Sequence, residues 1–522
     1  MQRRFILFIA ISVLILYASN YFALKNNPRP DTEPSRTVEQ REDPTPSSKP
    51  EKSKTRKPSP ALIGEFVRED NIKTQFVYNT IGAGVEGLSV IDYNLNKEKY
   101  QLIPMDTDPA SNLVKLTIGG VEYNLDDKIW EKETKKGDIW FTTEIFEGLF
   151  IRKSVKMTEI SYSGSIVVEI VNTNDDPYSL NEIKISWGPI NKTEKDRFDS
   201  HKALVYEAGK KKEYKEKNNQ DIKYHSIEKG WFGLKNQYFC AIFDFINDKI
   251  SQIAINVSHE NGIIADFIFK EDIIERKSNK KYEIPVYFGP QNYTLLKKTG
   301  YDHHKLVDFG WFHFIGVWML YILKFFYGIT KNYGVAIILL TILIRMLLWW
   351  PTQKSYTSMK KMQTEMNKMQ PRLKTIKELY KNNPQKLNEE TMKLYKEYQI
   401  NPMGGCLPML LQMPIFFALY STLVGAVELK GAPFVWMWQD LSSKDPSFVL
   451  PIAMGLSMFI QQKISTPPAA TPEAATQQKM MLYIMPVMLT IFAFMWPSGL
   501  LLYWVMSNLL SIGQQALINR RS

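Results

Sequence analysis

The apolar and polar positions divide the chain into two unlike parts. Residues 26–300 are polar and rich in turn-forming residues, and their apolar positions come in short alternating runs. Residues 310–518 instead contain long apolar runs, which a single lysine-rich stretch interrupts. An apolar run of about 20 residues is long enough to cross the hydrocarbon core of a bilayer as a helix. A purely soluble protein is therefore excluded.

Six apolar segments predict membrane-spanning helices. The first lies in residues 1–25, behind two arginines, and is typical of an uncleaved signal anchor; a cleaved signal peptide is the alternative. Lipid tolerates only helices or closed barrels, so a bundle of six helices is expected. A tight turn at 496–499 is expected to make the last two helices an antiparallel pair. The five later spans are predicted at 334–353, 405–428, 447–463, 480–497 and 499–517.

The charges between these spans predict their orientation. Segment 354–400 carries 11 Lys and Arg against 5 Asp and Glu, and both ends of the chain are basic. All these charges lie on one side if both termini are cytoplasmic, as basic cytoplasmic loops favour. A multi-pass protein of the cell inner membrane with segment 26–300 in the periplasm is thus predicted. The formal net charge of +11 is a topology signal, and no DNA partner is expected.

The polar part divides into a linker and a folded domain. Residues 26–60 are rich in Pro, Ser, Thr and charge, which predicts a disordered linker. Residues 61–300 contain many short alternating runs, including a hairpin signal at 113–125, and predict an all-β sandwich. Its expected role is that of a docking or spacer module, and the adjacent His303 and His304 are expected to be solvated.

An aromatic-rich segment joins the two parts. Residues 304–330 contain seven Trp, Phe and Tyr between 311 and 326, interspersed with His313 and Lys324. Such density at a membrane boundary predicts an amphipathic helix that lies in the interface. A further crossing is the alternative, but it would reverse the charge pattern of the later loops.

One arginine stands inside an apolar run. Placing Arg345 at the centre of a bilayer costs about 2.5 to more than 10 kcal/mol, so such residues usually face a polar cavity. The alternative is that the side chain reaches the cytoplasmic headgroups, because Trp350 lies about 8 Å further along the helix. No acidic residue lies well inside a span, so a water-filled cavity is the preferred interpretation. Polar residues that would share it are Thr341, Gln412, Ser507 and Asn508.

The cytoplasmic segment 354–400 is helical by composition. Four methionines recur at steps of three, four and three residues, which places them on one helix face. A second helix from about 385 to 398 would complete a hairpin, so the stripe is either its core or an adaptable contact surface. The surrounding lysines could contact anionic lipid or ribosomal RNA, or form a solvated face. The methionines are Met359, Met362, Met366 and Met369.

Several motifs occur in the order and spacing of a known family. Segment 401–420 (NPMGGCLPMLLQMPIFFALY) resembles the signature of the YidC/Oxa/Alb membrane protein insertases. The span with Arg345, the turn 496–499 (WPSG) and segment 502–508 (LYWVMSN) are similar to it as well. The resemblance covers about 304–520. The N-terminal anchor and large domain resemble the Gram-negative form.

This resemblance implies five core spans within 331–520 around a hydrophilic groove, closed on the extracytoplasmic side, and a β-supersandwich before them. It implies that nascent membrane proteins are inserted and helped to fold in the lipid bilayer, alone or with the Sec translocon. Ribosome contact would be weak and through the cytoplasmic loops, because few residues follow the last span. The groove residues it implies are Arg345, Thr341, Gln412, Trp504, Ser507 and Asn508, with Trp504 replacing a common tyrosine.

Other classes of protein lack their signals in this sequence. A secondary transporter or channel is the main alternative, but it would need acidic residues at mid-membrane and matching broken helices. No phosphate-binding G-x-x-x-x-G-K-S/T motif occurs, and the two cysteines and six histidines show no metal-ligand spacing. No cofactor or metal is expected, and no constellation points to an enzyme.

Overall fold

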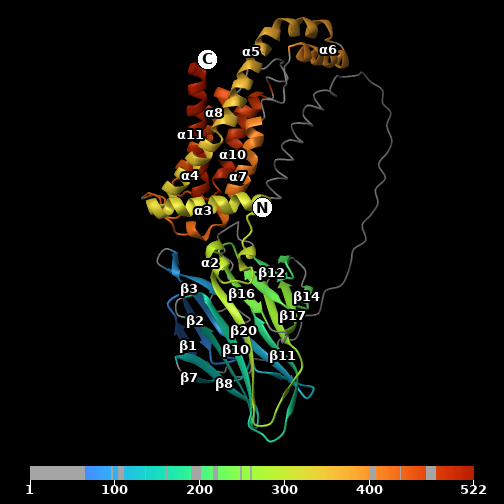
Figure 1. Ribbon diagram of the computed structural model, residues 1–522, viewed down its shortest axis with the longest axis vertical. Helices are drawn as coiled ribbons and strands as arrows, with labels where there is room; N and C mark the ends of the chain where they lie inside the picture. The colour runs from blue at the N-terminus through green and yellow to red at the C-terminus, as the bar shows by residue number, and fades with distance from the viewer. Residues whose placement is uncertain are drawn as a thin grey trace, which may run out of the picture.

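The computed structural model shows a β-rich part and a helical part, with helix α3 between them (Figure 1). The N-terminal span in residues 1–25 and the linker 26–60 lie outside the described residues. The structure describes residues 65–95, 98–103, 111–135, 137–158, 161–189, 201–215, 221–246, 250–258, 262–381, 383–398, 407–435, 437–465, 476 and 478–521.

Three antiparallel sheets form the β-rich part. The four-stranded sheet has the order β1 (Phe66–Asp70), β2 (Thr74–Asn79), β3 (Val85–Leu95), β4 (Glu98–Ile103). The nine-stranded sheet has the order β13 (Lys210–Lys215), β12 (Lys202–Glu207), β15 (Gly230–Lys235), β16 (Phe239–Phe245), β20 (Asn279–Pro290), β10 (Ser163–Asn172), β9 (Leu149–Met157), β8 (Asp138–Phe146), β7 (Glu131–Lys135). The seven-stranded sheet has the order β14 (Asp221–His225), β17 (Ile250–Ser258), β18 (Gly262–Phe269), β11 (Tyr178–Trp187), β5 (Leu113–Ile118), β6 (Val121–Asn124), and β19 (Asp272–Ile274) pairs with β11.

The core of this part lies between the two large sheets. Trp187 of the seven-stranded sheet stacks on Phe288 of the nine-stranded sheet with ring centres 4.8 Å apart. Phe243 packs edge-on against Trp187 and at a tilted angle against Phe267. The alternation of buried and exposed positions therefore has the two-residue period that the sequence predicts. The predicted hairpin is confirmed as β5–β6, whose turn residues Gly119 and Gly120 have φ values of +56° and +81°.

A short helical segment connects the sheets to the membrane part. His303 is buried, and its Nε2 and Nδ1 atoms lie 2.6 Å from the Asp244 carboxylate and 2.8 Å from the Thr299 hydroxyl. The expectation that His303 is solvated is therefore wrong, because a carboxylate and a hydroxyl replace water around its ring. His304 is only partly buried. The segment contains α2 (Tyr293–Lys298), η1 (His303–Leu306) and η2 (Gly310–Phe312).

The helical part begins with α3, which runs across the ends of the other helices (Figure 1). Among the described residues, Gly310–Thr330 is the one straight helix with the length and hydropathy to cross a membrane. The bent pair α4–α5 meets the same criteria when it is taken together. The helices are α3 (His313–Thr330), α4 (Tyr333–Leu347), α5 (Trp349–Leu379), α6 (Pro384–Glu397), α7 (Leu407–Gly425), η4 (Val427–Leu429), α8 (Val449–Ser465), η5 (Met480–Ile484), α10 (Met485–Ala493) and α11 (Ser498–Arg521).

Two features differ from the sequence prediction. The segment predicted as one span at 334–353 bends by 58° between α4 and α5, at Leu348. Pro351 lies just beyond the bend and has no N–H to donate to the Leu347 carbonyl, which weakens the helix at this point. The two helices joined by the turn 496–499 do not pack as a pair. Instead α8 lies between them, because both α10 and α11 pack against α8 (Figure 1).

Candidate functional site

The arginine predicted from the sequence lies between two helices. Arg345 is on α4, three residues before the bend, and its side chain is partly buried. Its Nη2 atom donates a hydrogen bond of 2.5 Å to the Ser507 hydroxyl on α11. Within the described part of the chain, no carboxylate pairs with this guanidinium. Arg345 and Ser507, which are far apart in sequence, are thus brought together as the core of the candidate site.

A second polar contact joins α7 to the same region of α11. The Gln412 amide donates a hydrogen bond of 2.8 Å to the Tyr503 hydroxyl, and Tyr503 is buried one helical turn before Ser507. Tyr503 was missed by sequence reasoning, although its spacing of four residues from Ser507 was a usable signal. Tyr503 directly precedes Trp504, the position at which the family resemblance implies that a tyrosine is common.

Trp504 joins this region through aromatic contacts. Its ring stacks on Trp496 with centres 5.3 Å apart and an interplanar angle of 13°. It also packs edge-on against Phe416 of α7, with ring centres 4.8 Å apart. Trp504 therefore bridges α7, α11 and the turn before α11, on the N-terminal side of Ser507.

Thr341 and Asn508, like Gln412 and Trp504, have hydrogen-bond or ring partners other than Arg345. Thr341 is fully buried, and its hydroxyl donates to the Ile337 carbonyl of its own helix at 2.7 Å. Asn508 points to another neighbour, because its amide donates to the Ser457 hydroxyl of α8 at 3.0 Å. The geometry therefore divides the predicted residues between the two sides of α11.

Polar contacts continue towards the C-terminal end of α11. Gln514 lies two turns after Ser507, and its amide donates to the Trp349 carbonyl at 3.2 Å and to the Thr352 hydroxyl at 3.1 Å. On the other side, Gln515 donates to the Ser465 hydroxyl of α8 at 2.5 Å. We call the contacts of Ser507 and Gln514 the α4 seam, and those of Asn508 and Gln515 the α8 seam. Sequence reasoning missed both glutamines, although they repeat Ser507 and Asn508 at a spacing of seven.

The N-terminal end of α11 is covered by the loop between η4 and α8. The Ser498 N–H and hydroxyl both donate to the Ser443 carbonyl, at 2.8 and 2.9 Å, and the Gly499 N–H donates to the Leu441 carbonyl at 2.9 Å. Asp445 fixes this loop by accepting from the Trp438 indole N–H and from the Leu450 N–H. Burial alone would raise the pKa of Asp445, but these and other hydrogen bonds hold it below the usual value.

The methionine stripe lies on α5 in the helical hairpin with α6. Met369 is fully buried and packs with Leu373 and Leu394 in a small core, so it is a core residue of the hairpin. Met362 and Met366 are partly buried against this core and keep some exposed surface. The side chain of Met359 lies outside the described residues. A contact surface thus stays a prediction for Met362 and Met366.

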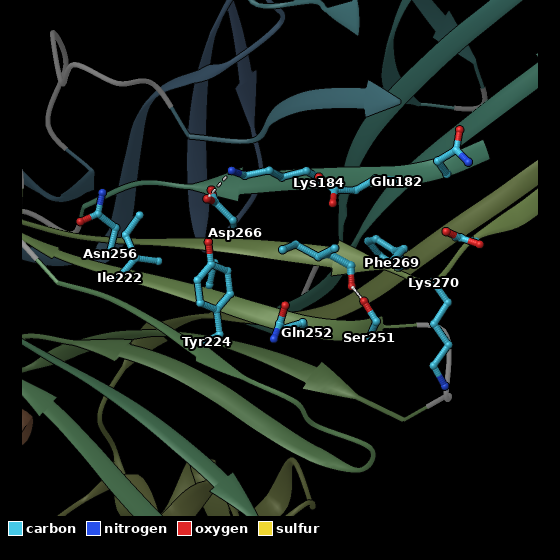
Figure 2. A pocket seen from close by; sticks show the side chains of 14 residues that line it. Glu182, Lys184, Ile222, Tyr224, Ser251, Gln252, Asn256, Asp266, Phe269 and Lys270 are labelled. Atoms are coloured by element: carbon cyan, nitrogen blue, oxygen red, sulfur yellow. Dashed lines mark hydrogen bonds and ion pairs between the residues drawn. The ribbon is translucent and has the colours of Figure 1, made fainter. Parts of the chain in front are cut away.

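No group of three or more His, Cys, Asp or Glu residues in the described segments could hold a metal ion. A shallow pocket of about 670 Å³ lies on the outer face of the seven-stranded sheet, far from the α4 seam (Figure 2). Asp266 at its edge is ion-paired with Lys184 at 2.8 Å, and the Ser251 hydroxyl donates to the Ile268 carbonyl. Two of its polar side chains are therefore held by neighbours within the sheet.

Two family models match the two parts of the chain. The model described as "60Kd inner membrane protein" matches residues 325–522, and the model described as "YidC periplasmic domain" matches residues 72–322. A membrane protein insertase YidC of Geotalea daltonii is 30% identical over all of this chain and 99% of its own length. The one of Syntrophus aciditrophicus is 41% identical over 56% of this chain, and the match spans about half of that relative (52%).

Similarity to solved structures is weaker. YidC of Thermotoga maritima is 14% identical, with a TM-score of 0.32 over 86% of this chain and 98% of that chain. A galactose mutarotase related enzyme of Lactobacillus acidophilus is 8% identical, with a TM-score of 0.32 over 43% of this chain and 97% of that chain. These scores are too low to carry an argument about function.

The two matched parts define a class of inner-membrane protein, in which a β-rich periplasmic domain precedes a helical C-terminal region. The chain belongs to the YidC family of membrane protein insertases. This is a family of insertases rather than of enzymes. The family resemblance, the β-rich domain and the helical C-terminal region predicted from the sequence are therefore confirmed.

Proposed function

We propose that this protein inserts transmembrane segments of nascent proteins through a hydrophilic groove built around Arg345. The observation that carries the proposal is the Arg345–Ser507 contact: a partly buried cation is bound by a hydroxyl, and no described carboxylate neutralises it. An uncompensated cation between helices is costly unless water or a ligand anion reaches it. The site is therefore suited to receive acidic residues of a client.

The proposed topology has six spans with both termini in the cytoplasm. This proposal is supported by helices α7, α8, η5–α10 and α11, which overlap the last four predicted spans, and by α4, which overlaps the predicted span 334–353 up to the bend at Leu348. Helix α3 is proposed to lie in the periplasmic interface, since it crosses the bundle ends and exposes one aromatic face (Figure 1). The loop that covers α11 at Ser443 and Leu441 would close the groove on that side.

The proposed mechanism uses electrostatics first and hydrophobic transfer second. A hydrated groove lowers the cost of bringing a short polar tail halfway into the bilayer. Arg345 attracts acidic residues of that tail, while the membrane potential contributes about 2.3 kcal/mol per charge per 100 mV. The apolar segment then passes along α7 and α11 into lipid, driven by burial of its apolar surface. Gln412, Trp504 and Ser507 line this route.

The proposed partners follow from the same geometry. The α5–α6 hairpin has an excess of basic residues and remains accessible beyond the bundle, so it is the proposed site of weak ribosome contact. Cooperation with the Sec translocon is proposed for larger clients.

Reconstitution in pure lipid vesicles tests the function. We expect the purified protein to insert a small single-span client without nucleotide. Absence of insertion together with flux of small solutes would contradict the proposal and favour a secondary transporter or channel.

A further inference from the structure

One edge of the nine-stranded sheet is strongly basic. Strand β13 is the outermost strand, and four of its six residues are lysines. We call Lys210, Lys211, Lys212 and Lys215 the basic edge. The only acidic residue in the strand is Glu213, whose carboxylate lies 3.7–3.8 Å from Lys202, Lys211 and Lys215. One carboxylate shared among three lysines leaves a net positive charge.

Protection of a sheet edge does not account for this charge. Lysines on edge strands prevent pairing with other chains, so they are expected on both edges of the sheet. The opposite edge, β7, contains Lys132 and Lys135 but balances them with Glu131 and Glu133. Both edge strands therefore carry lysines that oppose pairing with another chain, but of the two only β13 has an excess of positive charge. Strand β7 lies at the end of the sandwich that is remote from α3 (Figure 1).

The basic edge is held next to the segment that leads into α3. Tyr206 of β12 pairs directly with Lys211 in the sheet. The Tyr206 hydroxyl donates to Asp302 at 2.8 Å and accepts from Lys305 at 2.5 Å. The neighbouring strand β15 contributes Lys235, whose ammonium donates to the Leu306 carbonyl at 2.8 Å. Two strands, β12 and β15, are thus fixed to residues 302–306, immediately before the membrane part, and β13 is held there through its pairing with β12.

Electrostatics agrees with this placement. Burial would raise the pKa of Asp308, but the pKa lies below its usual value because the Gly310 N–H donates to the carboxylate and Lys211, Lys235 and Lys202 lie near it. Asp308 is three residues before Trp311, the first residue of the exposed aromatic face. The positive field of β13 therefore reaches the start of α3.

The exposed face of α3 indicates where the membrane surface is expected to lie relative to the sandwich. Trp311, Phe314, Trp318 and Phe325 are 81, 74, 57 and 65% exposed, whereas Leu320 on the other side is packed into the core of the sandwich. Tryptophan-rich faces of this kind lie at the level of the lipid headgroups. The basic edge is then close to a layer of phosphate groups.

We propose that the basic edge binds anionic phospholipid headgroups of the periplasmic leaflet and so holds the sandwich in a fixed orientation on the membrane. The proposal rests on the interfacial position of α3 given above. The ligand is a phosphodiester anion. A lysine ammonium attracts it as a point charge on a flexible side chain. The interaction should weaken with salt, because exposed charges are screened within about 10 Å at 0.1 M ionic strength.

Lysine reactivity in the full-length protein tests whether the basic edge binds anionic headgroups. The protein is placed in nanodiscs of phosphatidylcholine, with or without phosphatidylglycerol, and the reactivity of each lysine towards an amine reagent is measured by mass spectrometry. We expect phosphatidylglycerol to protect Lys210, Lys211 and Lys212 several-fold and high salt to abolish the protection. Lys132 and Lys135 of β7 are the matched control and should not change. Equal reactivity in both lipids, or equal protection of β7, overturns the proposal.

Retained lipid gives a second readout. Native mass spectrometry should find less bound phosphatidylglycerol on the variant Lys210→Gln/Lys211→Gln/Lys212→Gln than on the control Lys132→Gln/Lys135→Gln, with phosphatidylcholine unchanged. The same lipid content in both variants overturns the proposal. Neither readout uses client insertion, so failure of the insertase proposal in vesicles is detected separately.

Discussion

At the scale of single residues, the account depends on the charge of Arg345. A hydrogen bond to a charged group contributes about 1.5–3 kcal/mol, and each 1.4 kcal/mol corresponds to about a tenfold change in rate. Arg345→Ala should therefore slow insertion of clients with acidic tails by about tenfold or more. Arg345→Lys should be milder, because it keeps the charge but loses the planar fork. Both variants are compared in the vesicle insertion assay.

The matched control is a client whose acidic tail residues are replaced by their amides. For this client, Arg345→Ala and the unchanged protein should insert at similar rates. If acidic and neutral clients are slowed equally by Arg345→Ala, the arginine has a structural role and the electrostatic step is wrong.

A second residue, Lys153, predicts a pH dependence of stability. Its side chain is fully buried, donates to the Gly82 and Asn112 carbonyls at 2.7 and 2.5 Å, and lies over the Trp130 ring. Burial lowers its pKa from the ordinary 10.5 to about 7, although Asp126 opposes the shift. Between these two values the unfolded chain binds more protons than the folded one. The free energy of unfolding should therefore rise with pH in this window, by up to about 1.4 kcal/mol per pH unit.

Denaturant unfolding of the unchanged protein and of Lys153→Met, each between about pH 7 and pH 10, isolates this contribution. The difference between their free energies of unfolding should change with pH because only one of them can release the proton. Parallel pH profiles would show that Lys153 stays charged when buried.

At the scale of elements, α11 is held by the two seams at once. Interhelical hydrogen bonds in membranes contribute about 0.6 kcal/mol on average and at most about 1.7 kcal/mol. Gln514→Leu removes two of them at the bend between α4 and α5, so it should lower the free energy of unfolding by about 1–2 kcal/mol. Ser511→Ala is the control, since the Ser511 hydroxyl donates only to the Ser507 carbonyl of its own helix. Unfolding in mixed micelles measures both, and equal losses would mean that the α4 seam contributes nothing.

The elements themselves could largely be predicted from the sequence. The length of the apolar runs indicated where α4, α7, α8, α10 and α11 lie, and a Gly-Gly turn indicated the β5–β6 hairpin. Which helices pack together could not be predicted, because periodicity gives a buried face but not the neighbour that covers it. The position of α8 between α10 and α11 is the clearest example. Its Gly455 lies so close to Thr490 that a Cβ there would meet the hydroxyl at 2.0 Å.

The candidate site was predictable in part for a similar reason. Arg345 and Ser507 were recognisable because charged and polar groups inside apolar spans are costly. The sequence could not predict that Ser507 contacts α4 while Asn508 contacts α8, because these contacts depend on the rotation of α11 relative to α4 and α8. His303 was misjudged because its partner Asp244 is 59 residues away in the chain.

At the scale of the whole molecule, two contacts fasten the sandwich to the bundle. The Lys324 ammonium of α3 lies 2.7 Å from the Glu428 carboxylate and donates to the Thr294 hydroxyl of α2. The Gln237 amide, in the turn between β15 and β16, donates to the Val424 carbonyl at the end of α7 at 2.9 Å. Movements of the sandwich and of α7 should therefore be coupled.

Removal of Lys324 tests how its ion pair with Glu428, which joins α3 to η4 inside the helical part, supports the contact of α3 with α2. Lys324→Met leaves the buried Glu428 unpaired, which should cost about 3 kcal/mol, the lower end for a buried pair because Lys324 is 24% exposed. The double variant Lys324→Met/Glu428→Leu should recover most of the loss. Thermal unfolding and protease cleavage between α2 and η1 report the effect. A single variant as stable as the double variant would show that Glu428 does not need Lys324 as a partner inside the helical part.

The central claim is that water reaches Arg345 from the cytoplasm, and cysteine accessibility tests it most directly. In a protein with Cys240 and Cys406 replaced by alanine, Ser507→Cys and Gln412→Cys are exposed to a membrane-impermeant maleimide on the cytoplasmic side. The control is Ile491→Cys on the outer surface of α10, where the side chain is exposed and would face lipid. The account predicts rapid labelling at 507 and 412 and almost none at 491. If 507 and 412 are as unreactive as 491, the arginine lies in a dry interface and the groove does not exist.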